Sequence, residues 1–345
     1  MSSHPTGRVC LSPQRLALFC IAMLMAFAST APALLCQEKK AEATEPSKQA
    51  ETNKQAEANK QAPQDQDEIV RLRADLVVVS VTVTDAAGQY AHGLSGKDFL
   101  VLEDGAQQQV NNFSAEEAPF AAAILIDMSG SMEYKFGQVR GAAASFLDHI
   151  RENDQVAVFG FNDKVRQLQD FSSVRDITDY IWDAKAENMT RMYDCIDEAV
   201  TALNARSEKR RAVVLISDGW DSTSHKASLD SVMKKSLGAG VTIYTIDLTD
   251  DDTMRGTSST ALALQRGRSD MKEFADKTGG RYVHTPQGDK LDEAFINIVD
   301  ELRNQYTLTY YSTNAKRDGR WRKLNIGVRK DGLTARSRRG YWGPK

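Results

Sequence analysis

The sequence predicts an α/β fold, in which helices cover both faces of a doubly wound, mostly parallel sheet, together with a small β-sandwich. Two observations lead to this prediction. Between about residues 119 and 304, four apolar strand-like runs alternate with segments of helical periodicity, which is typical of βαβ units. On either side, residues 69–118 and 305–345 show short runs in which apolar and polar residues alternate. We therefore expect a central α/β domain at 119–304 and one sandwich built from both flanking segments.

Residues 1–33 have the pattern of a signal peptide. Arg8 and Arg15 precede the apolar run "LALFCIAMLMAFA", and "APA" ends the segment with small residues at the spacing that a signal peptidase recognises. An uncleaved anchor is the alternative, because residues 16–36 are long enough to reach across a bilayer. Cys36 also invites a lipoprotein interpretation, but Leu35 stands where a lipobox requires a small residue. We expect export to the periplasm, cell envelope or extracellular space, with membrane contact only if the segment stays uncleaved.

Residues 34–68 are expected to form a disordered linker. The stretch is rich in Lys, Glu, Gln and Ala, contains the near repeat "NKQAEANKQA", and has few large apolar residues. Such a composition cannot offset the entropy cost of ordering the chain.

Charge and cysteine content exclude several classes of protein. The formal net charge is −3, and no segment interleaves basic residues with aromatic ones, so nucleic acid is not an expected partner. Cys195 is the only cysteine beyond the presumed signal segment and its edge, which excludes a disulfide framework.

The flanking segments supply the strands of the expected sandwich. In residues 69–118, the expected strands are "LVVVSVTVTD", "DFLVLEDG" with its Asp-Gly turn, and "QQQVNNF". Two or three strands are too few to be stable alone in water. The carboxy-terminal runs "QYTLTYYS", "WRKLNIGVRK" and "LTARSRRGYW" are the expected partners.

In the central region, the expected strands are "AAAILIDMS", "VAVFGFN", "AVVLISDG" and "VTIYTIDL", and "FNDKVRQLQDF" is expected to form a hairpin to an edge strand. Helical periodicity or end signals predict helices at 136–150, 177–184, 192–203, 270–280 and 291–304.

Oxygen-bearing side chains gather at the expected carboxyl edge of this sheet. Asp127 ends one strand and is followed by Ser129 and Ser131, Asp218 ends another strand, and Thr190 opens the helix before it. In a doubly wound sheet, ligands bind at the carboxyl ends of the strands. Carboxylates and hydroxyls without His or Cys favour Mg2+, Mn2+ or Ca2+. The alternative is that Asp127 and the serines only cap the following helix.

These residues carry a family resemblance. "DMSGS", with a later Thr and a later strand-end Asp, resembles the metal-ion-dependent adhesion site (MIDAS) of von Willebrand factor type A (VWA) domains. The resemblance implies that Ser129, Ser131 and Thr190 bind the metal directly and that Asp127 and Asp218 act mostly through water. Asn188 and Met189 stand where many members have glycines. The flanking β segments resemble those of a bacterial subfamily in which this domain lies between them.

The resemblance implies a non-enzymatic, metal-dependent binding or adhesion module whose protein partner presents an Asp or Glu side chain to the cation. A metal-assisted hydrolase is the alternative from another class, although "DMSGSM" lacks a nucleophile elbow and has no clearly placed His. A structural envelope protein with an unused metal site is the third possibility.

Three further stretches are candidates for function. The run "DLTDDDT" at 247–253 is expected to be either a second cation site or a solvated loop. Trp220 and Asp221 are expected at the rim of the metal site, as specificity residues or as packing and capping residues. The basic stretch 209–211 is expected to be a solvated turn beside a strand.

Overall fold

The computed structural model describes residues 76–115, 118–173, 189–285 and 290–345. All of them lie in one compact unit that begins at Glu68. The expected signal segment, the linker and the helix expected at 177–184 lie outside the described residues. Among the described residues, no helix is long and apolar enough to cross a membrane.

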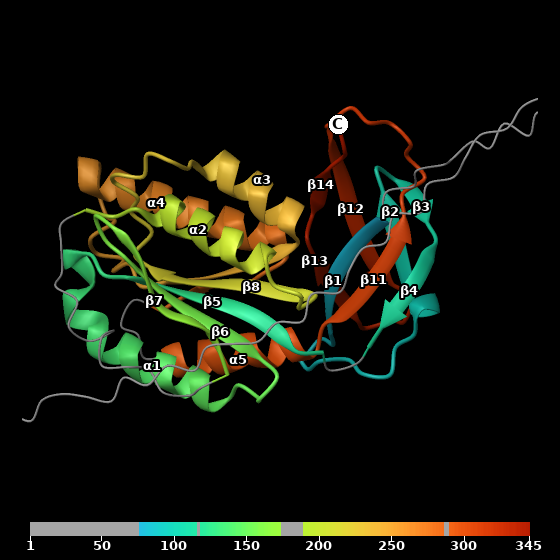
Figure 1. The fold of residues 1–345 in the computed structure, drawn as a ribbon, viewed down its shortest axis with the longest axis horizontal. Coiled ribbons are helices and arrows are strands. Elements are labelled where there is room, and N and C mark those ends of the chain that lie inside the picture. The colour runs from blue at the N-terminus through green and yellow to red at the C-terminus, as the bar shows by residue number, and fades with distance from the viewer. Residues whose placement is uncertain (1–75, 116–117, 174–188, 286–289) are drawn as a thin grey trace, which may run out of the picture. The chain divides into compact units, whose positions relative to one another are not determined.

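A six-stranded sheet forms the centre of the α/β part (Figure 1). Its strand order is β10-β9-β8-β5-β6-β7, and only the hairpin pair β6 and β7 is antiparallel. The strands are β5 (Phe120–Asp127), β6 (Gln155–Phe161), β7 (Val165–Ser172), β8 (Arg210–Ser217), β9 (Val241–Asp247) and β10 (Tyr282–His284). The predicted doubly wound, mostly parallel sheet is therefore confirmed.

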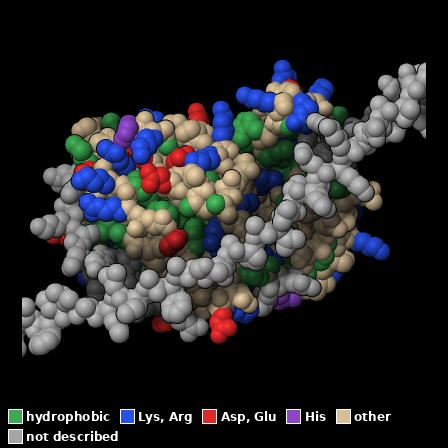
Figure 2. Space-filling model, in the orientation of Figure 1, with side chains coloured by type: hydrophobic (Ala, Val, Ile, Leu, Met, Phe, Trp, Pro, Cys, Tyr) green, Lys and Arg blue, Asp and Glu red, His purple; other side chains and the backbone are tan. Residues whose placement is uncertain are grey.

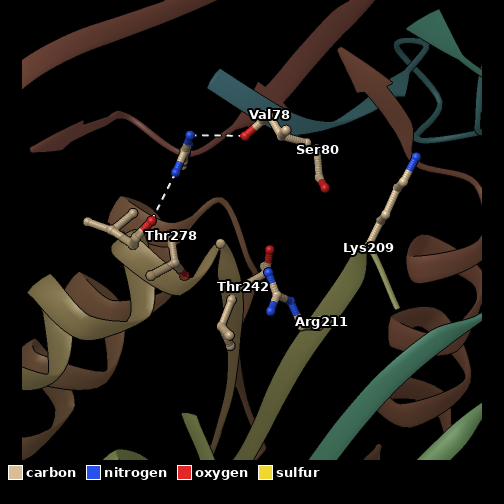
Figure 3. A pocket seen from close by; sticks show the side chains of 10 residues that line it. Val78, Ser80, Lys209, Arg211, Thr242 and Thr278 are labelled. Carbon is tan, nitrogen blue, oxygen red and sulfur yellow. Dashed lines mark hydrogen bonds between the residues drawn. The ribbon is translucent and has the colours of Figure 1, made fainter. Parts of the chain in front are cut away.

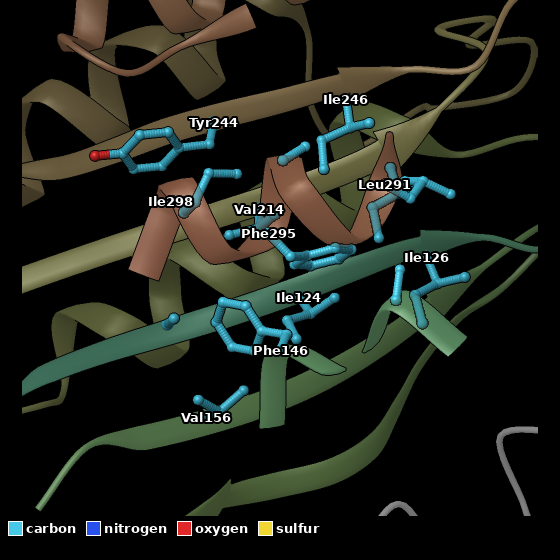
Figure 4. Packing of buried hydrophobic residues seen from close by; sticks show 14 of the residues in the cluster. Ile124, Ile126, Phe146, Val156, Val214, Tyr244, Ile246, Leu291, Phe295 and Ile298 are labelled. Carbon is cyan, nitrogen blue, oxygen red and sulfur yellow. The ribbon is translucent and has the colours of Figure 1, made fainter. Parts of the chain in front are cut away.

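Helices cover both faces of this sheet, as Figure 1 shows. On one face lie α1 (Phe136–Asp148), which follows the 3-10 helix η2 (Gly130–Lys135), and α5 (Leu291–Arg303). On the other lie α2 (Met192–Asn204), α3 (Leu229–Ala239) and α4 (Ser259–Thr278). All eight residues of β5 are buried between the two layers. Figure 4 shows the first face, where the rings of Phe146 and Phe295 meet edge to face at 5.3 Å between centroids.

The flanking segments form two four-stranded sheets with a shared hydrophobic core. One sheet has the order β13-β1-β11-β4 and the other β14-β12-β2-β3. Their elements are β1 (Leu76–Thr84), η1 (Gly96–Asp98), β2 (Phe99–Glu103), β3 (Ala106–Gln108), β4 (Val110–Ser114), β11 (Tyr306–Tyr311), β12 (Trp321–Val328), β13 (Thr334–Ser337) and β14 (Gly340–Trp342). Each sheet contains two strands from either end of the chain, and in the first sheet they alternate, so the predicted sandwich is confirmed.

Three local predictions need correction. The run 333–342 is two strands in different sheets rather than one strand. Helix α4 begins at Ser259, well before the predicted start, and α3 was not predicted. The stretch 209–211 is not simply a solvated turn, because Arg210 is buried and begins β8. Its guanidinium donates hydrogen bonds to the carbonyl oxygens of Arg303 at 2.8 Å and Gln305 at 2.6 Å, which replace the water it loses.

Charged side chains of both signs mix on the visible face of the α/β part (Figure 2). Lys and Arg side chains there lie among Asp and Glu side chains rather than in a continuous stripe.

Candidate functional site

Two neighbouring strands bring two aspartates to the carboxyl edge of the sheet. Asp127 is the last residue of β5, and Asp218 directly follows β8. The strands pair in parallel up to Ile126 and Ile216, so both carboxylates arrive at the same edge. The connection after β5 leads to α1 on one face and the connection after β8 leads to α3 on the other. This is the switch point at which doubly wound sheets bind ligands.

Hydrogen bonds connect four of the five predicted residues. Ser129 donates its backbone N–H to Asp127 Oδ1 at 2.9 Å, and the hydroxyls of Ser129 and Ser131 lie 3.1 Å apart. Ser131 Oγ donates to Asp218 Oδ2 at 2.6 Å. Ser129 occupies the N-cap position of η2, yet its side chain makes no capping hydrogen bond. Capping alone therefore does not account for these hydroxyls.

Thr190 lies two residues before α2 and is buried. Its backbone N–H donates to Ser222 Oγ at 2.8 Å, and its carbonyl accepts from the backbone N–H of Ser222 at 3.0 Å. These bonds tie Thr190 to the loop that follows Asp218. Within the described parts of the chain, no hydrogen bond joins the Thr190 hydroxyl to the other four residues.

The two carboxylates concentrate negative charge in the site. Asp127 is fully buried, and burial together with the nearby charge of Asp218 raises the pKa of Asp127 to about 7. Ser217 Oγ opposes this effect by donating to Asp127 Oδ2 at 2.5 Å. A bound cation would relieve the repulsion between the carboxylates and stabilise their charged forms.

The donor set fits a hard divalent cation. It offers two carboxylates and three hydroxyls, which are ligand types that Mg2+, Mn2+ and Ca2+ accept. Among the described residues, no group of three or more His, Cys, Asp or Glu side chains is placed to hold a metal ion. A site that depends on Ser and Thr hydroxyls is consistent with that finding.

A buried polar cluster contacts the backbone of Asp218. Most of this cluster was not predicted from the sequence. Thr249 Oγ1 donates to the Asp218 carbonyl at 2.7 Å. Thr249 also donates its backbone N–H to Asp247 Oδ1 at 2.8 Å. Asp247 in turn accepts from Arg268 Nε at 2.7 Å and from the Tyr282 hydroxyl at 2.5 Å. The only signal in the sequence is the strand-end position of Asp247.

This cluster settles the role of part of the run 247–253. Asp247 is buried and paired with a protein cation, Arg268, and Asp251 is exposed and contacts Arg268 Nη1 at 2.9 Å. Asp250 and Asp252 are exposed. The first carboxylate of the run is therefore part of an internal ion pair, and the remaining ones lie at the surface.

Trp220 and Asp221 have different roles beside the site. Asp221 accepts from the backbone N–H of Tyr193 at 3.2 Å and from Ser224 Oγ at 2.6 Å, so it links its loop to the start of α2. Burial raises the pKa of this carboxyl. The Trp220 side chain is 38% exposed and lines a cavity of about 250 Å³ that also includes Tyr193 and Arg266.

Comparison with known proteins identifies the central region. Residues 123–278 match the family model described as von Willebrand factor type A domain. A comparison with curated protein sequences gave no match.

Several solved structures are similar to parts of the chain. A von Willebrand factor type A protein from Catenulispora acidiphila has 12% sequence identity, with 78% of this chain and 74% of that chain covered and a TM-score of 0.45. An aerotolerance-related membrane protein from Bacteroides fragilis has 16% identity, with 53% and 98% covered and a TM-score of 0.39. Proximal thread matrix protein 1 from the mussel byssus, with a zinc-occupied MIDAS motif, has 18% identity, with 58% and 50% covered and a TM-score of 0.45.

Proposed function

Since the chain carries a von Willebrand factor type A domain over residues 123–278, we propose that this domain is a binding module whose MIDAS holds a divalent cation and engages a protein partner. Domains of this family are commonly metal-dependent modules of adhesion and protein interaction. The proposed ligands are Asp127, Ser129, Ser131, Thr190 and Asp218. The proposed ion is Mg2+, with Mn2+ and Ca2+ as chemically similar alternatives.

One observation carries the proposal. The hydrogen-bonded group of Asp127, Ser129, Ser131 and Asp218 lies at the switch point of the sheet, with two carboxylates and two hydroxyls close together. In the proposed arrangement the Ser and Thr hydroxyls contact the ion directly, and the two carboxylates hold its water molecules. Neutral hydroxyl ligands leave the cation electrophilic, so that it can accept an Asp or Glu carboxylate from a partner.

The proposed module is not an enzyme. The Ser131 hydroxyl donates a hydrogen bond to Asp218, which directs its proton to the carboxylate and leaves oxygen lone pairs for a cation. Residues 1–33 support export as part of the same proposal. A binding module in the periplasm, in the cell envelope or outside the cell would meet partner proteins there.

Calorimetric titration of Mg2+ and Mn2+ into the purified chain tests the metal site. We expect saturable binding that is lost in Asp127→Ala and in Ser131→Ala. Ser131 is exposed, so its replacement is not expected to disturb the fold, and circular dichroism checks this. The exposed Asp148→Ala variant is the matched control and should bind the ion as the parent protein does. Equal binding by the parent protein and Ser131→Ala would contradict the proposal.

A further inference from the structure

A basic cleft lies at the end of the sheet opposite the proposed metal site. A cavity of about 70 Å³ adjoins a wider one of about 400 Å³, and the two share the lining residues Val78, Arg211, Leu237, Gly240 and Arg338. Arg211 lies near the start of β8, whereas Asp218 follows its end. Seven residues of extended strand separate the two positions by roughly 20 Å.

The charged side chains that line this cleft are all cationic. Lys209, Arg211 and Arg338 line the smaller cavity, and Lys234 joins them in the wider one. Among the described residues, neither lining includes an Asp or Glu side chain. In Figure 3, Lys209 and Arg211 lie at the start of β8, and the Arg211 side chain lies beside Thr242, across from the strand that carries Val78 and Ser80.

Arg211 has no anionic partner among the residues that the structure describes. Its Nη1 donates to Asn204 Oδ1 at 3.5 Å, and its Nε is buried without a hydrogen-bond partner. The nearby carboxylate of Glu208 is paired with Arg206 at 3.0 Å. Burial of the Arg211 guanidinium removes water from its charged form and lowers its pKa.

Arg338 is held in place by backbone carbonyls and an aromatic ring. Its guanidinium donates to the Leu237 carbonyl at 3.0 Å and to the Val78 carbonyl at 2.9 Å, and it lies 5.4 Å from the centroid of the Tyr341 ring. In the described chain, no carboxylate forms an ion pair with it. Burial lowers the pKa of this group as well. Two partly buried guanidinium groups therefore face one cleft without a counter-charge, an arrangement that costs free energy unless an anion is bound.

We propose that this cleft is a binding site for a phosphate-type oxyanion. A doubly charged tetrahedral anion neutralises more than one cation, and guanidinium groups match its oxygens with paired donors. Arg338, which is fixed by its hydrogen bonds, provides a preorganised donor group, and Arg211 provides a charge without a counter-ion. The Ser80 hydroxyl, which lines the same cavity, adds a neutral donor. The site is independent of the proposed metal site and does not need it to be occupied.

Titration of inorganic phosphate into the full chain tests the site, in EDTA and at constant ionic strength. We expect saturable binding in calorimetry and a rise in the melting temperature, because a ligand that binds only the folded state stabilises it. Arg211→Gln should weaken phosphate binding by about tenfold or more, since charge-assisted hydrogen bonds are lost. Because the Arg211 side chain makes a single, long hydrogen bond to the described residues, its replacement is not expected to lower stability without phosphate.

The matched control is Arg320→Gln, which removes the same charge from a side chain that is 85% exposed. Its phosphate affinity should equal that of the parent protein. If Arg211→Gln and the parent protein bind phosphate equally, the proposal is wrong.

A phosphate group could come from a free ion or from a lipid headgroup, and a second arm separates the two sources. Co-sedimentation with vesicles that contain phosphatidic acid, whose phosphomonoester can carry two charges, would assign the cleft to a headgroup if it is lost in Arg211→Gln and free phosphate binds weakly. Binding of free phosphate without co-sedimentation would assign it to a soluble anion. Both outcomes support an oxyanion site, and the absence of both overturns it.

Discussion

Glu103 and Arg322 lie in the core of the β-sandwich, where each side chain is almost fully buried. Glu103 accepts hydrogen bonds from the Tyr310 hydroxyl at 2.7 Å, the Ser312 hydroxyl at 2.7 Å and the Tyr341 hydroxyl at 2.9 Å. Arg322 Nη1 lies 3.5 Å from the same carboxylate. The charges of Glu103 and Arg322 compensate each other, so removing one side chain leaves the other as an uncompensated buried charge.

We expect Glu103→Ala to lower the free energy of unfolding by about 3–5 kcal/mol, because Arg322 would remain buried and unpaired. Urea denaturation followed by circular dichroism measures the change. Glu133→Ala, at an exposed position of η2, should change stability by less than about 0.5 kcal/mol. Equal midpoints for the two variants would show that the buried pair contributes nothing.

Two glycines bring α4 against the proposed metal site. A Cβ at Gly267 would lie 1.9 Å from the Gly219 carbonyl oxygen, and Gly219 itself has a φ of +82° that favours glycine. Gly219 directly follows Asp218. The absence of a side chain at Gly267 therefore allows the helix to support the loop that carries a proposed ligand.

Gly267→Ala should push α4 away from this loop and weaken Mg2+ binding by about tenfold, which is the scale of changes in groups that support metal ligands. Calorimetric titration with Mg2+ measures the effect. Gly141→Ala is the matched control, because a Cβ on that helical glycine meets no atom within 4 Å. It should leave Mg2+ affinity unchanged and raise stability by up to about 1 kcal/mol. Unchanged affinity in Gly267→Ala would separate α4 from the site.

Individual residues differed in how well the sequence predicted them. The strand-end positions of Asp127 and Asp218 follow from local patterns, because the end of a strand determines the edge that a residue reaches. Burial of Arg210 does not follow from local patterns. It depends on carbonyl groups around residues 303–305, which meet Arg210 only in the folded molecule.

At the scale of elements, most strands and the helices with a long apolar stripe were predictable. Helix α3 was not, because its sequence "LDSVMKKSLGA" carries only a few apolar side chains on its buried face, with Ser236 buried among them. The first half of α4 was missed for a similar reason, since it contains several exposed and charged residues. Tertiary packing and end signals, rather than periodicity, specify these segments.

The start of α3 has a complete capping arrangement. Ser228 Oγ accepts the backbone N–H of Ser231 at 3.3 Å, and Ser231 Oγ accepts the backbone N–H of Ser228 at 2.8 Å. We expect Ser228→Ala to lower the free energy of unfolding by about 1 kcal/mol, which is the usual contribution of an N-cap. Chemical denaturation measures it, with the exposed Ser259→Ala as a control that removes a hydroxyl without a cap. A difference of zero between the variants would contradict a capping role.

At the scale of the whole folded unit, the buried carboxylate of Glu301 on α5 joins the α/β part to the sandwich. It accepts the Tyr244 hydroxyl of β9 at 2.7 Å and the Thr82 hydroxyl of β1 at 3.4 Å, and it pairs with Arg336 of β13. That both ends of the chain share one sandwich was predictable from the number of strands. The contacts of Glu301 that attach the sandwich to α5 were not predictable, because a sequence pattern does not indicate how one packed layer is oriented against another.

Glu301→Ala should weaken this attachment and lower the free energy of unfolding by about 3–5 kcal/mol, because Arg336 loses its buried partner. In differential scanning calorimetry we expect the main transition to broaden or split into two. Glu293→Ala on the same helix is exposed and should leave the melting profile unchanged. A single, unshifted transition in Glu301→Ala would show that other contacts are sufficient.

The interleaving of strands from both ends of the chain also determines when the sandwich can assemble. Among the described strands, β1 pairs with β11 and β13, and β4 pairs with β11. During synthesis, β1 therefore cannot form its sheet until the whole central sheet has been made and these partner strands follow. Its apolar residues stay available to chaperones or to other nascent chains during that interval. Pairing with β11 buries the apolar residues of β1, so the last segment of the chain is needed to fold its first strands.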